Sequence, residues 1–141
     1  IARLSIRECR RHIRPDCSEA GFRLLLAGLV ARAVEARMDD SNFHYWVATG
    51  DDAVCGVCVL RETTHLYHLF VESEWQGRGI ARRLWEAARD DVLARSPLPR
   101  TFTVNASTFA RPVYAKLGFR MSGEALSRNG IRSWPMSLQL S

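Results

Sequence analysis

The stretch that most constrains this chain is Leu66–Arg83, which reads LYHLFVESEWQGRGIARR. It begins as an apolar run that suits a β-strand, passes through a polar turn and continues into a helical pattern. At the junction, Gly77 and Gly79 leave backbone N–H groups uncovered by side chains at the positive end of the following helix. This arrangement predicts a binding site for an anion such as a diphosphate. The alternative is a tight turn that needs glycine only for its backbone angles.

Two other kinds of phosphate loop are excluded by the spacing. No Gly-Lys-Ser or Gly-Lys-Thr ending follows, so the stretch is not a nucleoside-triphosphate loop. A third glycine at the dinucleotide-binding spacing is also missing, and the loop comes in the middle of the chain after other expected strands.

The composition is that of a globular protein, and we expect one domain over residues 1–141, with 47% hydrophobic and 25% charged residues. No apolar run reaches the ~20 residues that cross a bilayer, and Ile1–Arg14 lacks the apolar core of a signal peptide.

All but one of the 20 basic residues are arginines, and they are spread along the chain. A basic nucleic-acid-binding domain is therefore a less favoured alternative, and we expect neither a nucleic-acid nor a membrane partner.

The four cysteines include a C-x-x-C, Cys55 to Cys58, within an expected strand. Residues three apart on a strand point to opposite faces, so this pair suits neither a metal nor a disulfide. We therefore expect reduced thiols, no metal site and a cytoplasmic location.

Hydrophobic periodicity predicts the order β–α–ββ–β–α–β–α–ββ, a mixed sheet of the α/β or α+β class with helices on both faces. Pro135 predicts that the last strand lies at an edge or carries a bulge. The expected strands are Leu4–Cys9, His44–Thr49, Ala53–Leu60, Thr63–Val71, Thr101–Val104, Phe119–Glu124 and Ile131–Leu140. The expected helices are Phe22–Met38 (which Gly28 can divide), one from Ile80 that Ser96-Pro97 closes, and Phe109–Leu117.

Two motifs occur together. Leu69-Phe70-Val71 followed by Gln76–Ala81 fits the signature Q/R-x-x-G-x-G/A, and Ala110–Phe119 ends in Tyr-x-Lys-Leu-Gly-Phe. From Trp46 onward the chain resembles the GNAT family of acyl-CoA N-acyltransferases, whereas the N-terminal third matches only in pattern. The resemblance implies a mostly antiparallel sheet of six to seven strands with a splayed central parallel pair.

For cofactor binding, the resemblance implies acetyl-CoA as co-substrate. Its pantetheine arm would pair with the backbone of the strand, and its diphosphate would lie on the N–H groups of the glycine loop. The arginines of the loop and helix either contact phosphate or are solvated, and Asn105 either binds pantetheine or caps the next helix. The expected cofactor-binding residues are Leu69, Phe70, Val71, Gln76, Gly77, Arg78, Gly79, Ile80, Ala81, Arg82, Asn105 and Tyr114.

The implied reaction is aminolysis of a thioester, which needs a neutral amine, an oxyanion donor and a proton for the thiolate. Tyr114 resembles the general acid of the family, since a phenol keeps its proton at neutral pH. His65 and His68, expected on opposite faces of the strand, are the candidate bases, with ordered water as the alternative. The resemblance favours His65, six residues before Val71, as the base or the start of a water relay. The backbone N–H of Phe70 or Val71 is the expected oxyanion donor.

The function implied by the resemblance is N-acetylation of a primary amine on a small molecule or peptide. The regions that set acceptor specificity in the family carry no recognisable signature in this sequence. A catalytically idle acyl-CoA sensor is the alternative function. Dimerisation through the C-terminal edge is compatible with the sequence.

Overall fold

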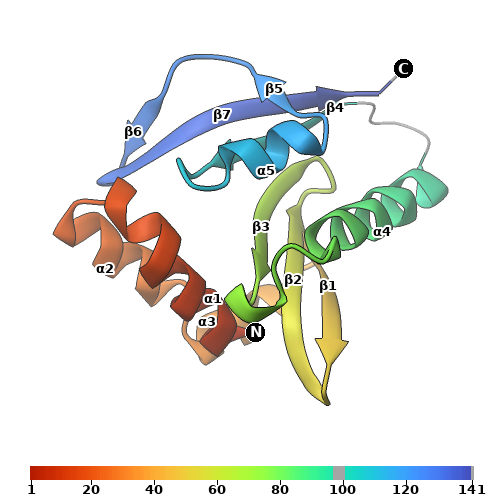
Figure 1. Ribbon diagram of the computed structural model, residues 1–141, viewed down its shortest axis with the longest axis horizontal. Coiled ribbons are helices and arrows are strands. Elements are labelled where there is room, and N and C mark those ends of the chain that lie inside the picture. The colour runs from red at the N-terminus through yellow and green to blue at the C-terminus, as the bar shows by residue number, and fades with distance from the viewer. Residues whose placement is uncertain (97–100, 141) are drawn as a thin grey trace.

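The computed structural model describes residues 1–96 and 101–140, which form five α-helices and a seven-stranded sheet (Figure 1). The helices are α1 (Ala2–Glu8), α2 (Glu19–Ala27), α3 (Ala31–Met38), α4 (Ile80–Arg95) and α5 (Arg111–Lys116). The strands are β1 (Phe43–Gly50), β2 (Ala53–Arg61), β3 (His65–Val71), β4 (Thr101–Ala106), β5 (Arg120–Met121), β6 (Leu126–Arg128) and β7 (Ile131–Gln139).

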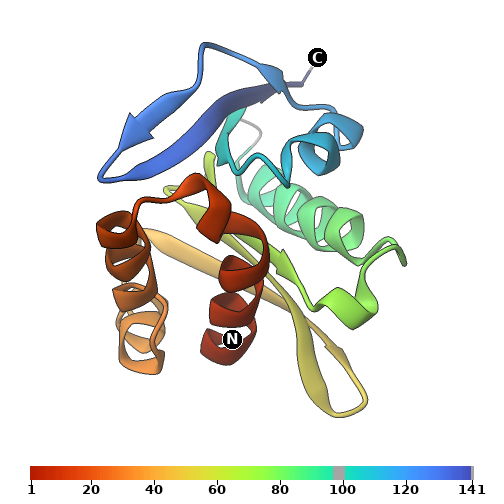
Figure 2. The same cartoon turned by 60° about the vertical axis from the view of Figure 1, so that its left-hand side comes forward.

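The sheet confirms the predicted mixed and mostly antiparallel architecture. Its strand order is β1-β2-β3-β4-β7-β5, and β6 pairs with β7. Among the described strands only β3 and β4 pair in parallel, and α4 lies between them in the chain. Figures 1 and 2 show α1, α2 and α3 together on one side of the sheet and α4 on the other, so both faces are covered as expected.

Three apolar clusters form on the two faces of the sheet. The largest contains Trp85 and Ala88 of α4, Tyr114 of α5 and Phe102 of β4. A smaller one places Leu4 of α1 against Val57 and Val59 of β2. In the described part of the chain, no helix has the length and apolarity that crossing a bilayer requires.

The first expected element is wrong, because residues 2–8 form helix α1 and not a strand. The alternation of apolar and polar residues there does not match the observed burial. The buried positions are Leu4, Ser5, Glu8 and Cys9, a helical spacing that includes two polar residues. The long N-terminal helix is divided near Gly28, as anticipated, into α2 and α3.

The C-terminal strands also differ from expectation. Asn129 and Gly130 form the turn of a hairpin as predicted, but its first strand is β6, and the region Phe119–Glu124 keeps only the two-residue β5. Strand β7 is not an edge, since β4 lies on one side and β5 and β6 on the other. Pro135 is tolerated because its nitrogen, which has no hydrogen to donate, faces the interruption between β5 and β6, on the same side as its carbonyl, which accepts from Ser122 N–H. Pro97 lies outside the described residues.

Candidate active site

The parallel pair β3–β4 opens after two residue pairs. His65 lies opposite Thr103 and Leu66 opposite Val104, and no further pair follows. On the other side, β3 stays paired with β2 up to Val71. The gap predicted between the strands that end near Val71 and Val104 is therefore present, with one side formed by the backbone of β3.

The hydrogen-bond alternation of β2 and β3 shows which backbone groups of β3 face this gap. Glu72 N–H donates to the Cys55 carbonyl at 2.8 Å, so Phe70, two residues earlier, also bonds to β2. Leu69 and Val71 then direct their N–H and C=O groups away from β2. Consistently, the Val71 carbonyl accepts from Gln76 Nε2 at 2.9 Å. Of the two expected oxyanion donors, only Val71 N–H faces the gap.

A bulge in β3 changes the arrangement of the two histidines. Val59 pairs with His68 and Leu60 with Leu66, so Tyr67 has no partner on β2. The Tyr67 and His68 rings lie 4.3 Å apart on the same face, although the residues are adjacent in sequence.

His65 shares that face as well. Its Nδ1 lies 2.8 Å from Thr103 Oγ1, and Thr103 points away from the core that contains Phe102 and Val104. The expectation of opposite faces for His65 and His68 is therefore wrong, and the cause is the extra residue of the bulge.

The surroundings of the two histidines affect their pKa values to different extents. Burial, and then the positive charge of Arg37, lower the pKa of His68 to about 3. Burial, and then the charge of Arg61, lower the pKa of His65, while Glu62 opposes this shift. Both rings are thus neutral at pH 7, and a pKa near 3 makes His68 a very weak base.

The glycine loop precedes α4 as expected. Gly77 and Gly79 have φ angles of 77° and 78°, in the left-handed region that favours glycine. A Cβ built on either residue meets no atom within 4 Å. Gly79 is the N-cap of α4 and provides no side-chain cap, and the first turn of the helix contains no acidic residue. The loop therefore offers open space beside backbone N–H groups at a helix N-terminus, which fits a diphosphate.

Most side chains around the glycine loop contact other residues of the protein. Ile80 and Ala81 are partly buried against the largest cluster, so their side chains contact protein while their backbone N–H groups lie at the start of the helix. Arg82 Nη2 donates to the Lys116 carbonyl at 2.7 Å. The Arg78 guanidinium lies 4.8 Å from the centre of the Trp75 ring, which keeps it beside the loop.

The elements that follow β4 carry Tyr114 and Asn105. Tyr114, on α5, is 6% exposed within the largest cluster, and burial, then Cys58, raise its pKa. Asn105 is exposed on β4, on the face opposite Val104 and Ala106. Ser107 Oγ accepts from Ala110 N–H at 3.1 Å in the turn before α5, and the helix itself has no side-chain cap from Asn105 or any other residue that the structure describes.

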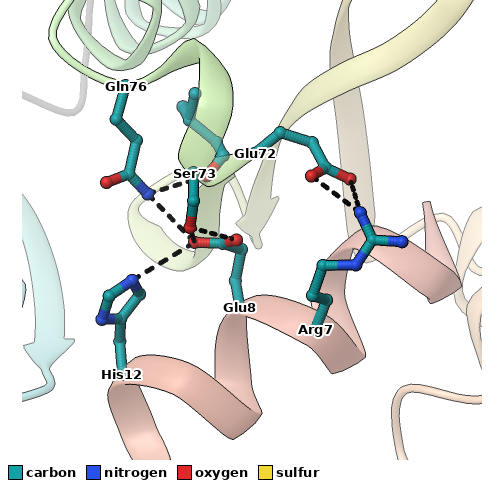
Figure 3. Close-up of polar contacts among 7 residues, drawn as sticks. Arg7, Glu8, His12, Glu72, Ser73 and Gln76 are labelled. Carbon is teal, nitrogen blue, oxygen red and sulfur yellow. Dashed lines mark hydrogen bonds and ion pairs between the residues drawn. The ribbon is translucent and has the colours of Figure 1, made fainter.

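The N-terminal segment supplies contacts that the sequence did not predict. Glu8 of α1 lies against the turn between β3 and the glycine loop, where it accepts from Ser73 and Gln76 (Figure 3). Asp16 Oδ1 and Oδ2 accept from Thr108 Oγ1 and N–H at 2.6 and 2.8 Å, in the loop before α5. Neither contact had a signal in the sequence, because Glu8 lay within the expected strand Leu4–Cys9 and Asp16 lay in a stretch typical of turns.

Two cavities lie away from the gap between β3 and β4. One, of about 440 Å³, lies at the outer edge of β1 and includes Trp46, whose Nε1 donates to Asp91. The other, of about 490 Å³, lies between α5 and the β5–β7 region and includes Phe119. All four cysteines are free, and no group of three or more potential metal ligands occurs in residues 1–96 and 101–140.

A family model described as an acetyltransferase (GNAT) domain matches residues 13–140. The chain therefore belongs to the GNAT acetyltransferase family, as the two sequence motifs predicted. No curated protein matches the sequence.

Solved structures of this family share the fold. A GCN5-related N-acetyltransferase from Rhodopseudomonas palustris is 21% identical, with a TM-score of 0.78 over 99% of this chain and 87% of that chain. The PaiA N-acetyltransferase from Thermoplasma acidophilum, in complex with coenzyme A, is 12% identical, with a TM-score of 0.78 over 98% and 89%. An aminoglycoside 6'-N-acetyltransferase complexed with coenzyme A is 16% identical, with a TM-score of 0.63 over 79% of each chain.

Proposed function

We propose that this protein is an acetyl-CoA-dependent N-acetyltransferase that acts on a primary amine of a small molecule or peptide. The observation that carries the proposal is the gap between β3 and β4, which opens beside an uncovered glycine loop at the N-terminus of α4. The coenzyme A complexes of two structural neighbours support the choice of acyl donor. The four free thiols support a reducing compartment, which we propose is the cytoplasm.

In this proposal strand β3 and the glycine loop bind different parts of acetyl-CoA. Leu69 presents free backbone N–H and C=O groups to the amides of pantetheine, in the manner of an added strand. Val71, whose carbonyl is bonded to Gln76, keeps its N–H for the thioester end of the donor. The N–H groups from Gly77 to Arg82 bind the diphosphate, with Arg78 alongside as a further cation. Gln76 contributes by fixing the turn, because its side-chain nitrogen is already bonded to Glu8 and to the Val71 carbonyl.

The chemistry requires charge stabilisation and two proton transfers. Val71 N–H donates to the thioester oxygen, where negative charge develops during attack by the amine. His65 is the favoured base, directly or through water, because the pKa of His68 is too low. Tyr114 donates its phenolic proton to the departing thiolate, and the proton released by the amine restores the balance. Its raised pKa keeps the phenol protonated until that step.

The proposal is tested by a thiol-release assay with acetyl-CoA against a panel of amines, amino acids, polyamines and peptides. We expect release above background with at least one acceptor, and loss of most of this activity in Tyr114→Phe. Binding of coenzyme A without turnover across the panel would instead support an acyl-CoA sensor. Absence of both binding and turnover would refute the proposal.

A further inference from the structure

Glu8 is a buried carboxylate on α1, with only 3% of its surface exposed. Ionised side chains are seldom buried without partners, because burial removes their hydration. Glu8 accepts from Ser73 Oγ at 3.0 and 3.3 Å and from Gln76 Nε2 at 3.0 Å. His12 Nε2 lies 3.6 Å from the same carboxylate. Both hydrogen-bond donors belong to the short segment between β3 and the glycine loop.

The neighbouring residue on α1 reaches the same segment. Arg7 Nη1 donates to both carboxylate oxygens of Glu72 at 3.0 Å. Figure 3 shows the two side chains extending from α1 side by side, each toward one part of this turn. The ion pair of Arg7 is partly exposed, with 45% of that side chain accessible, so it is weaker than the buried contact of Glu8.

Gln76 connects this contact to the glycine loop. Its Nε2 donates to Glu8 and also to the Val71 carbonyl, which closes the turn from the end of β3. Gly77 follows directly, and the Cβ directions of Gly77 and Gly79 meet no protein atom within 4 Å. The orientation of the loop N–H groups therefore depends on the anchors at its two ends, which are α4 on one side and the Gln76–Glu8 contact on the other.

We propose that Glu8 is a positioning residue for diphosphate binding, which holds the Ser73–Gln76 turn so that the N–H groups of Gly77 and Gly79 converge on the anion. This inference rests on the proposed function, since coenzyme A supplies the diphosphate. Glu8 acts through Gln76 and Ser73, and its carboxylate oxygens are already occupied by them. The charge matters because hydrogen bonds to a carboxylate are stronger than those to a neutral amide.

The substitution Glu8→Gln keeps the size of the side chain but removes the charge and replaces one acceptor oxygen with a donor. Gln76 Nε2 then donates to a neutral oxygen, which is a weaker acceptor, and Ser73 Oγ has to share that oxygen or turn to accept from the new NH₂. The matched control is Glu19→Gln on α2, because Glu19 is 85% exposed and contacts only Arg23 among the described side chains.

The measurement compares the Kd values of two ligands by isothermal titration calorimetry. The Kd of the weaker ligand is obtained by competition with the stronger one. Coenzyme A contains the diphosphate, and pantetheine lacks it. We expect Glu8→Gln to weaken coenzyme A binding about tenfold, the loss of roughly one charged hydrogen bond, and to leave pantetheine binding within about twofold. Glu19→Gln should change neither value. A general loss of structure would weaken both ligands alike.

Two results overturn the inference while leaving the proposed function intact. One is wild-type affinity for coenzyme A in Glu8→Gln, and the other is an equal loss of affinity for both ligands. If Glu8→Gln does not fold, Ser73→Ala removes one donor to the same carboxylate and should weaken coenzyme A selectively; an unchanged ratio of the two affinities in that variant refutes the inference. Failure of the wild-type protein to bind coenzyme A refutes the proposed function and, with it, this inference.

Discussion

The substitution Gly79→Ala separates the contribution of the glycine loop to stability from its contribution to binding. Gly79 has a φ of 78°, which costs an alanine about 1 kcal/mol relative to glycine. The added methyl group meets no protein atom within 4 Å, so no steric cost is added. We therefore expect the unfolding free energy to fall by about 1 kcal/mol and Tm by about 4 °C.

Binding should be affected more strongly than stability. The methyl group occupies the open side of the loop, where the diphosphate would approach the N–H groups. Loss of one charged hydrogen bond corresponds to about 1.5–3 kcal/mol, or roughly a 10- to 150-fold increase in the Kd for coenzyme A. Calorimetric titration measures the Kd, and differential scanning calorimetry measures Tm.

Gly118→Ala is the control for backbone strain. Gly118 has a φ of 104°, and its added Cβ would lie 3.2 Å from Leu138 Cδ1, so Tm should fall at least as far as in Gly79→Ala. Because Gly118 follows α5 and is not part of the glycine loop, the Kd for coenzyme A should stay within about twofold of wild type. Wild-type affinity in Gly79→Ala, or an equal loss in both variants, would refute the diphosphate site.

Three further predictions concern the gap. Tyr114→Phe should lower kcat about 100-fold with little change in the Kd for coenzyme A, measured by thiol release and titration; an unchanged kcat contradicts the role of the phenol. His65→Gln should lower kcat/KM. In the wild type, kcat/KM should fall with decreasing pH at a point below pH 6.5, because the pKa of His65 is lowered, and this fall should be absent in the variant. A fall that persists in the variant would show that another group causes it. Because His68 is neutral in the folded state with a pKa of about 3 but protonates near 6.5 when unfolded, stability should fall as the pH drops below 6.5. Thermal melts of His68→Gln should show a shallower decline, and equal slopes would contradict the burial of this ring.

Much of the fold was predictable because its determinants are local. The glycine loop combines two residues of unusual backbone freedom with a strand before it and a helix after it, all within 18 residues. The hairpin between β1 and β2 is likewise fixed by its own turn, where Asp51 and Asp52 adopt φ angles of 52° and 60°. Apolar periodicity predicted α4 because this pattern, too, depends only on residues close together in the sequence.

The arrangement of the histidines was not predictable, because it depends on how β3 pairs with β2. Strict alternation would place His65 and His68 on opposite faces. The bulge at Tyr67 moves every later residue of β3 by one position relative to β2, and nothing in the sequence HLYHLFV marks that position. The resemblance favoured His65 from its position alone, whereas the shared face and the low pKa of His68 depend on the register and the surroundings of each ring.

The N-terminal segment matched the family only in pattern, yet its contacts join parts of the site that are distant in sequence. Glu8 bonds to residues after β3, and Asp16 bonds to Thr108 after β4. Ser18 N–H donates to the Gly130 carbonyl at 2.7 Å, at the turn between β6 and β7. These contacts span 65 to 112 residues, beyond the reach of any local signal, and they are polar, so hydrophobic periodicity does not register them. Because the segment contacts residues after both β3 and β4, we expect a substitution within it to change donor binding without contacting the donor. The proposed role of Glu8 therefore rests on the structure and not on the motif.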